Sequence, residues 1–273
     1  MQCGTAKRLS FKRVWYRFLN ARRAFDFWLR TRVRVRRPGI LRPSLTDQKL
    51  GEEVGNFLQL FHWPRGYQKE PLRVVDVGAK NFFLAPQLER HFQSLHFDPE
   101  IVGIEMDAFR RYRTGWTRND FGHLYAAQVN KGAYYALDFL NWHQPVDVAL
   151  LLHPFVTLRA LQAWGLPDRC FKPRVIMDHL RSVLALSRFQ CLVLSSPAEH
   201  ELAMAKTLAQ ASGFHVMENA CWTPCHDSLQ TQPRWGSLLS LKDPHAWREL
   251  LGDTEERAFE IMSWGKGIFL DGP

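Results

Sequence analysis

The sequence lacks any uninterrupted apolar run of about 18 to 20 residues, the length that a membrane-spanning helix needs. Its longest apolar stretches are broken by Arg, His or Asp. These interruptions exclude an ordinary transmembrane segment. With 46% hydrophobic residues among 273, the chain is nevertheless long and apolar enough to bury a substantial core. We therefore expect a soluble body.

Cysteine is also scarce, with five residues in the whole chain, an odd number. Such a low count does not fit a disulfide scaffold, and Cys191 lies inside the apolar run CLVLSS, which is typical of a reduced, buried thiol. A reducing, cytoplasmic location follows. Cys221, Cys225 and His226 are residue types that bind zinc, but no second Cys or His pair completes a tetrahedral set. We predict no metal site.

Acidic residues are nearly missing from residues 1–43, where Asp26 stands against thirteen Lys or Arg and gives a net charge of +12. Because the whole chain carries +9, everything after residue 43 carries −3. The positive charge therefore belongs to an N-terminal arm. Apolar residues recur within residues 11–29 at three- and four-residue steps, which predicts a basic amphipathic helix.

Four interpretations of this arm remain open. Arg and Lys interleaved with Phe and Trp are suited to RNA, through phosphate contacts and base stacking. The same pattern is suited to an anionic membrane surface, and hence to peripheral membrane association. An Arg-rich, acid-poor N-terminus is also typical of a mitochondrial transit segment. The fourth interpretation is a helix that packs its aromatic stripe on the rest of the protein and leaves its charges in solvent.

Strand-like and helix-like patterns alternate from residue 73 onward. Strands are predicted at residues 73–77, 101–105, 133–139, 146–152, 190–196, 215–222 and 235–242, and helices at 82–96, from 108, at 174–187 and at 197–212. Such alternation predicts a doubly wound α/β fold: a mostly parallel seven-stranded sheet with helices on both faces and an antiparallel edge hairpin. We divide the chain into the arm (1–43), a helical lead-in (44–72), this domain (73–242) and a C-terminal extension (243–273).

Acidic residues follow three of these predicted strands. Asp76 and Gly78 close the first, Glu105 ends the second, and Asp138 lies at the end of the third. Ligands of such sheets bind beyond the carboxyl ends of the strands. The G-x-G-x-x-G loop of dinucleotide-binding dehydrogenases is absent, and Glu105 lies 27 residues beyond Gly78, where about 20 is usual. A dehydrogenase is therefore disfavoured.

This ordered set resembles the class I, Rossmann-like S-adenosylmethionine-dependent methyltransferase family over residues 73–242. The resemblance implies a loop after Asp76 that passes under the cofactor, a Glu105 carboxylate that receives the ribose hydroxyls, and an Asp138 that reaches the adenine amino group. It implies S-adenosylmethionine as the cofactor. The expected cofactor-binding residues are Asp76, Gly78, Ala79, Lys80, Asn81, Glu105, Met106 and Asp138.

The loop after Asp76 departs from the family pattern, because Lys80 and Phe82 stand where further glycines are typical. We expect a bulkier loop that either shifts the cofactor or weakens the pocket. The alternative to an enzyme is therefore a non-catalytic, Rossmann-like scaffold or binding protein, or an adaptor that acts through the basic arm.

The fourth predicted strand ends in Leu152-His153-Pro154-Phe155. This segment lacks the amide or carboxylate that would accept hydrogen bonds from an amine, so methylation of an exocyclic base amine is not supported. His153 is the candidate catalytic residue, as a general base or to orient a substrate; alternatively a backbone carbonyl holds it at the sheet edge. Two further groups, Asp107 and Arg110-Arg111, either reach the cofactor mouth or are solvated in a first helical turn. The predicted function is a methyltransferase whose acceptor is unassigned.

Overall fold

The computed structural model describes residues 40–64, 70–223 and 233–251. Most of the basic arm, including its predicted helix, lies outside the described residues, as do Cys225, His226 and residues 252–273. None of the described helices is both long enough and apolar enough to cross a membrane.

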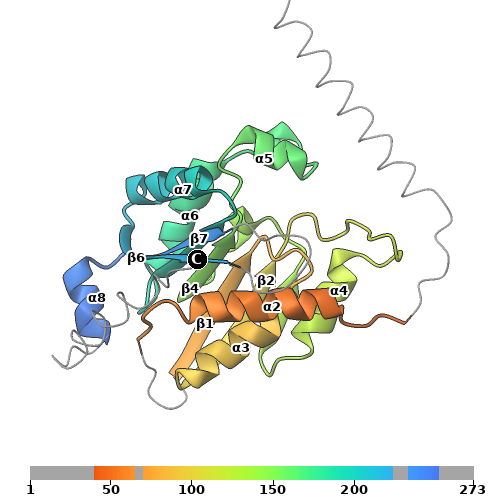
Figure 1. Ribbon diagram of the computed structural model, residues 1–273, viewed down its shortest axis with the longest axis horizontal. Coiled ribbons are helices and arrows are strands. Elements are labelled where there is room, and N and C mark those ends of the chain that lie inside the picture. The colour runs from red at the N-terminus through yellow and green to blue at the C-terminus, as the bar shows by residue number, and fades with distance from the viewer. Residues whose placement is uncertain (1–39, 65–69, 224–232, 252–273) are drawn as a thin grey trace, which may run out of the picture.

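A single seven-stranded sheet forms the centre of the molecule, with the strand order β3-β2-β1-β4-β5-β7-β6 (Figure 1). Strands β1 to β5 are parallel, and β7 runs antiparallel to both β5 and β6. This is the predicted doubly wound, mostly parallel sheet with an antiparallel edge pair. The strands are β1 (Glu70–Val77), β2 (Phe97–Ile104), β3 (Gly132–Tyr135), β4 (Val148–Leu152), β5 (Cys191–Ser196), β6 (His215–Trp222) and β7 (Arg234–Ser240).

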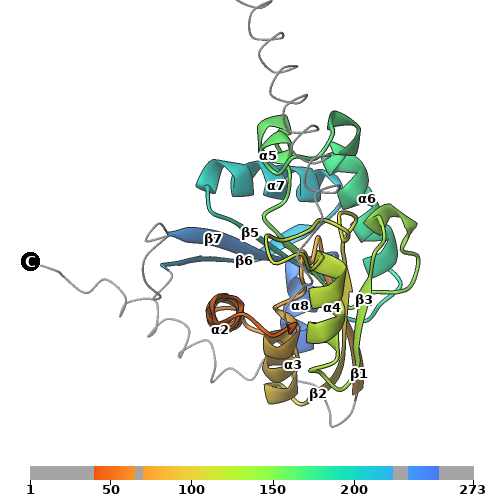
Figure 2. The ribbon, with the colours of Figure 1, turned by 90° about the vertical axis from the view of Figure 1, so that its right-hand side faces the viewer.

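Helices cover both faces of the sheet, and each face has its own core (Figures 1 and 2). Helices α2, α3, α4 and α8 contribute to the core on one face, and α6 and α7 to the core on the other. Their bounds are α2 (Leu45–Leu58), α3 (Ala85–Ser94), α4 (Arg118–Ala126), α5 (Leu158–Ala163), α6 (Pro173–Leu184), α7 (Glu199–Ala211) and α8 (Pro244–Leu251), with 3₁₀ turns η1 (Phe139–Asn141) and η2 (Asp168–Cys170).

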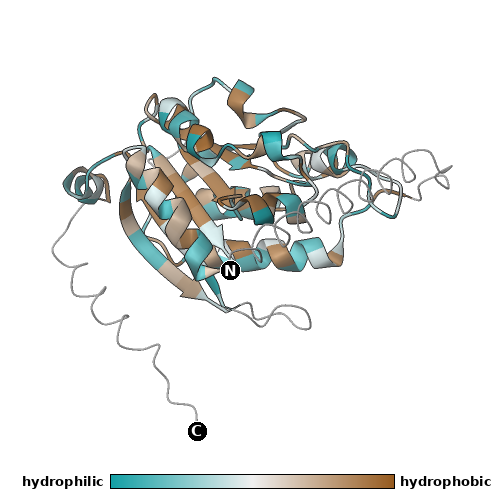
Figure 3. Ribbon diagram, turned by 90° about the horizontal axis from the view of Figure 1, so that it is seen from above, coloured by the Kyte–Doolittle hydropathy of each residue, from teal (hydrophilic) through white to brown (hydrophobic). Residues whose placement is uncertain are grey.

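Strand β1 shows why the sheet needs helices on both sides. Leu72 and Val74 belong to one core, while Val75 and Val77 belong to the other, because successive side chains point to opposite faces. A strand that is apolar on both faces must be covered twice. Figure 3 shows the resulting apolar strands in brown beneath helices that carry teal, hydrophilic segments.

Helix α2 joins the predicted lead-in to the sheet domain. Ser44 caps its first turn by accepting a hydrogen bond from the Asp47 backbone N–H. Near its end, Phe57 is buried and stacks on Trp222, with ring centroids 4.0 Å apart. The same ring also lies against β7, since a Cβ added at Gly236 would lie 2.3 Å from Phe57. The lead-in therefore shares one hydrophobic core with the sheet.

The helix predicted from residue 108 is wrong. Residues 107–116 form turns, and Arg111 pairs with Thr117 in an isolated antiparallel bridge. The helix that follows, α4, begins after Thr117. There the Thr117 side chain accepts from the Asp120 N–H, and the Asp120 carboxylate accepts from the Thr117 N–H. This reciprocal capping box fixes the start of the helix, and its Thr-x-x-Asp spacing is visible in the sequence.

Candidate functional site

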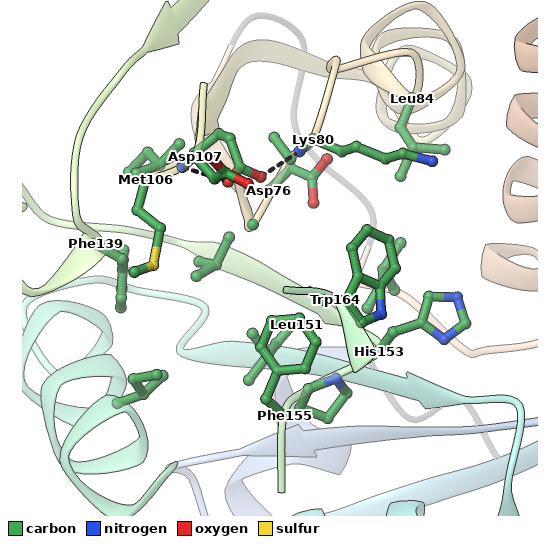
Figure 4. A pocket seen from close by; sticks show the side chains of 18 of the residues that line it. Asp76, Lys80, Leu84, Met106, Asp107, Phe139, Leu151, His153, Phe155 and Trp164 are labelled. Atoms are coloured by element: carbon green, nitrogen blue, oxygen red, sulfur yellow. Dashed lines mark hydrogen bonds between the residues drawn. The ribbon is translucent and has the colours of Figure 1, made fainter. Parts of the chain in front are cut away.

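A cavity of about 630 Å³ lies at the carboxyl ends of the parallel strands (Figure 4). Its walls come from the segments after β1, β2, β3 and β4, from α2 and α5, and from the ends of β6 and β7. This is where open α/β sheets bind ligands, and the volume lies in the range of small-molecule sites.

Seven of the eight residues predicted to bind a cofactor line this cavity, together with His153. The exception is Asn81. Its side chain is buried, and its Nδ2 donates to the Asp47 carboxylate at 2.8 Å, so it ties the loop to α2. The seven are Asp76, Gly78, Ala79, Lys80, Glu105, Met106 and Asp138.

The loop after β1 keeps a glycine-like backbone with one glycine only. Gly78, Lys80 and Phe82 have φ values of 76°, 54° and 62°, all in the left-handed region that favours glycine. A Cβ added at Gly78 would find nothing within 4 Å, so the space over this turn is open. The loop therefore keeps three left-handed positions although two of them carry side chains.

Phe82 does not line the cavity, although its size led us to expect a bulkier loop there. Its ring is fully buried, and a Cβ added at Gly103 of β2 would lie 2.5 Å from it. The missing side chain at Gly103 thus makes the space that Phe82 occupies. The Phe82 ring also lies near the Tyr134 ring, with 5.9 Å between the ring centroids. The hydrophobic core therefore accommodates the large side chain of Phe82.

The Glu105 carboxylate faces the loop after β1. Oε2 accepts from the Lys80 backbone N–H at 2.9 Å, and Oε1 accepts from the Asp107 N–H at 2.7 Å. Arg118 Nη1 lies 3.5 Å from Oε1. Burial raises the pKa of Glu105, whereas Arg118 and the two backbone hydrogen bonds oppose the rise. Because a carboxylate has about four lone-pair sites, the bonded group still has acceptor capacity for hydroxyl donors.

Asp76 is the carboxyl group of the site with the strongest perturbation. Its side chain ends β1 and is buried, and burial followed by the neighbouring Glu105 charge raises its pKa to about 7. Asp76 therefore titrates near neutral pH, in contrast to an ordinary aspartate.

Met106 and Phe139 lie on the same side of the cavity in Figure 4, where β2 and β3 end. Asp138 precedes Phe139 and caps the short η1 turn, accepting from the Leu140 N–H at 3.1 Å. This end of the cavity thus pairs apolar side chains with one carboxylate, a combination suited to a planar ring that carries an amino group.

His153 follows β4 with a left-handed φ of 59°, and its backbone N–H donates to Ser195 at 2.8 Å. Its Nε2 lies 3.2 Å from Arg234 Nη1. Arginine can only donate, so Nε2 accepts and the ring proton is on Nδ1. Burial, Arg234 and Lys80 lower the pKa of His153 to about 4. The ring is held by a guanidinium rather than a backbone carbonyl, and it is a weak base suited to orienting a substrate.

Trp164, which follows α5, also lines this cavity and was not among the predicted site residues. Arg110 Nη1 donates to the Trp164 carbonyl at 2.7 Å, and the Lys80 ammonium and the Arg118 guanidinium lie 5.7 and 5.8 Å from its ring centroid. Both cations are within range of a cation–π contact. Asp107 and Arg110 line the cavity, which agrees with the interpretation that they reach its mouth. Arg111 does not line it and donates to the Gly115 carbonyl.

Among the described residues, no group of three His, Cys, Asp or Glu side chains is placed to hold a metal ion. Cys170, Cys191 and Cys221 are free thiols, of which Cys191 is buried and Cys221 is exposed. The remaining two members of the Cys221, Cys225 and His226 set lie outside the described residues.

No family model and no curated protein matches the sequence. Solved structures that are similar to it include magnesium protoporphyrin IX methyltransferase from Synechocystis PCC 6803 with bound SAM, at 15% identity and a TM-score of 0.45, covering 84% of this chain and 96% of that chain. Another is precorrin-6y C5,15-methyltransferase from Geobacter metallireducens, at 14% identity and a TM-score of 0.44, covering 74% and 91%. A third is M. jannaschii TYW2 in complex with AdoMet, at 10% identity and a TM-score of 0.44, covering 73% and 78%.

Proposed function

We propose that the protein is an S-adenosylmethionine-dependent methyltransferase. The observation that carries the proposal is the position of Glu105: its carboxylate is hydrogen-bonded to the loop after β1 and lines a cavity at the carboxyl ends of the strands. A carboxylate accepts two adjacent hydroxyls at once, and the open space over Gly78 leaves room for a ligand to pass.

The residues present fit this cofactor. Glu105 would hold the ribose hydroxyls, Met106 and Asp138 would hold the adenine, and the backbone from Gly78 to Lys80 would face the amino-acid end. The cofactor supplies an electrophilic methyl group when bound. The chain would contribute binding and orientation of the two reactants through the residues that line the cavity.

The end of β4 forms the side on which an acceptor would bind. Here His153 keeps a neutral ring and directs an Nδ1–H donor rather than a strong base. The scaffold alternative was motivated by Lys80 and Phe82, but Phe82 packs in the core and the φ values of the loop are those of glycine. No observation in the described residues favours that alternative.

The decisive experiment is isothermal titration of the full chain with S-adenosylmethionine and with its demethylated product, S-adenosylhomocysteine. We expect heat that fits one site. Glu105→Gln should weaken binding by roughly 10- to 100-fold, because hydrogen bonds to a charged group are lost. Glu100→Gln is the matched control, since this exposed carboxylate of β2 pairs with Arg73 and does not line the cavity.

Absence of heat with either compound at millimolar concentration would remove the enzyme assignment. Equal binding by Glu105→Gln and the wild-type chain, with both proteins folded by circular dichroism, would contradict the ribose-binding role.

A further inference from the structure

One side of the cavity is distinctly cationic. It lies between α2, the loop after β1, the end of β4 and the adjoining ends of β6 and β7. In Figure 4, Lys80 and His153 extend toward this side, away from Met106 and Asp107. We call it the cationic side. Its members are Lys49, Leu50, Glu53, Val54, Lys80, Phe83, His153, Trp222 and Arg234.

The Lys80 ammonium lacks a counter-ion among the described residues. No described carboxylate lies within 4.0 Å of Nζ, which contacts the face of Trp164 instead. Burial and Arg118 lower the pKa of Lys80, against the attraction of Asp47 and Glu105. A half-buried cation costs free energy unless an anion pairs with it. A ligand anion in the cavity would supply that pairing.

His153 and Arg234 add directed donors beside this charge. The His153 Nδ1–H has no acceptor among the described residues, because the single ring contact is from Arg234 to Nε2. Arg234 and Lys80 both lower the pKa of His153, and all three residues line the same cavity. Glu53 attracts Arg234, and Asp47 and Glu105 attract Lys80 without approaching its ammonium within 4.0 Å. Lys80 and the exposed Lys49 therefore have no direct ion pair among the described residues.

The rest of the cationic side is apolar. Leu50 and Val54 come from α2, Phe83 from the loop after β1, and Trp222 from the end of β6, where it stacks on Phe57. An apolar wall with a few convergent donors is the usual composition of a site for an organic anion, because the body packs on the wall and the charge meets the donors.

We propose that the cationic side binds the methyl acceptor, and that the acceptor is a small organic acid: one carboxylate on an apolar body, with the carboxylate held by Lys80, Arg234 and the Nδ1–H of His153. The inference rests on the proposed function, since it names the substrate class for the same cavity. It gives His153 a positioning role, because the ring orients an anion and does not accept its proton.

The test is calorimetric titration of the full chain with benzoate, and with benzamide as a neutral ligand of the same shape. Both are measured with and without saturating S-adenosylhomocysteine. We expect benzoate to bind at least about tenfold more tightly than benzamide, with an affinity that S-adenosylhomocysteine leaves unchanged. Equal affinities would overturn the proposal. Competition between benzoate and S-adenosylhomocysteine would also overturn it, because the cations would then serve the amino-acid carboxylate of the cofactor.

Variants separate the anion site from the cofactor site. Arg234→Gln should weaken benzoate binding at least about tenfold and leave S-adenosylhomocysteine binding within twofold, whereas Arg234→Lys should recover most of the loss. Arg113→Gln, at an exposed arginine that does not line the cavity, is the matched control. Unchanged benzoate affinity in folded Arg234→Gln would overturn the proposal. The chain could also bind benzoate in an Arg234-dependent way and fail to bind S-adenosylhomocysteine. That result would refute the methyltransferase assignment alone and would still support the anion site.

Discussion

Lys80 and Phe82 hold the same left-handed backbone for opposite structural reasons. A side chain in this region costs roughly 1 to 2 kcal/mol relative to glycine. At Phe82 the cost is offset by a fully buried ring that fills the space over Gly103. At Lys80 the side chain is only half-buried and has no described counter-ion, so the offset is absent.

The two positions should therefore respond oppositely to glycine. Lys80→Gly relieves backbone strain and removes a poorly compensated cation, so we expect the free energy of unfolding to rise by up to about 1 kcal/mol. Phe82→Gly empties part of the core and should lower it by about 2 to 4 kcal/mol. Urea denaturation of both variants measures the difference. A destabilised Lys80→Gly would show that the lysine makes contacts stronger than the strain.

Asp76 makes stability depend on pH. The unfolded chain has its ordinary aspartate pKa of 3.8, while the folded pKa is about 7. Between these values the folded state keeps a proton that the unfolded state releases, so the free energy of unfolding falls as pH rises from about 4 to 7.

Asp76→Asn removes this titration and keeps the size of the side chain. We expect equal stability of variant and wild type near pH 4, and a variant more stable by roughly 2 to 4 kcal/mol at pH 8. Urea midpoints across pH 4 to 8 test the difference. Parallel pH profiles for the two proteins would mean that Asp76 ionises normally in the folded state.

At the scale of elements, α2 is held over the cavity by a polar contact as well as by its apolar face. The Asp47 carboxylate accepts from Asn81 Nδ2 at 2.8 Å and from the Tyr125 hydroxyl at 3.2 Å, which joins α2, the loop after β1 and α4. Both donors belong to buried residues. The wall formed by α2 is thus coupled to the loop that is proposed to bind the cofactor.

Asp47→Ala should lower the free energy of unfolding by about 1 to 3 kcal/mol, because it leaves two buried donors unsatisfied. The control is Asp98→Ala, whose exposed pair with Lys131 should be worth about 1 kcal/mol or less. Thermal unfolding compares the two. Similar losses at both positions would show that water satisfies Asn81 and Tyr125 when Asp47 is absent.

For the whole molecule, the distribution of charge separates the arm from the domain. The net charge of residues 1–39 is +11. Because the whole chain has a net charge of +9, the remainder carries −2. Whatever binding the protein shows to polyanions should therefore belong to the arm. RNA and an anionic membrane remain the two partners that its composition favours.

Deletion of residues 1–39 should abolish salt-dependent binding to single-stranded RNA and to vesicles that contain phosphatidylserine, while S-adenosylhomocysteine still binds. Fluorescence anisotropy and vesicle sedimentation between 50 and 300 mM salt, on the order of physiological strength, measure both. Binding by the full chain to one probe alone would identify the partner class. Polyanion binding retained after the deletion would place it on the domain.

The sequence by itself determined the mostly parallel sheet with its antiparallel edge pair and the carboxylates at the strand ends. Apolar runs of four to eight residues report strands directly, and parallel strands bring their carboxyl ends to one edge, so Asp76, Glu105 and Asp138 had to meet there. The capping box at Thr117 is equally local, because its Thr-x-x-Asp spacing marks the start of α4, ten residues after the wrongly predicted helix start at residue 108.

Only the tertiary structure decided where individual side chains point. Asn81 turned toward α2, Phe82 turned into the space at Gly103, and Arg234 reached His153 from 81 residues away. Trp164 reached the cavity wall, where its carbonyl accepts a hydrogen bond from Arg110. Periodicity reports which face of an element is apolar, whereas these directions depend on packing between segments that are distant in the sequence. For this reason the sequence predicted where the cavity lies but did not predict its cationic side.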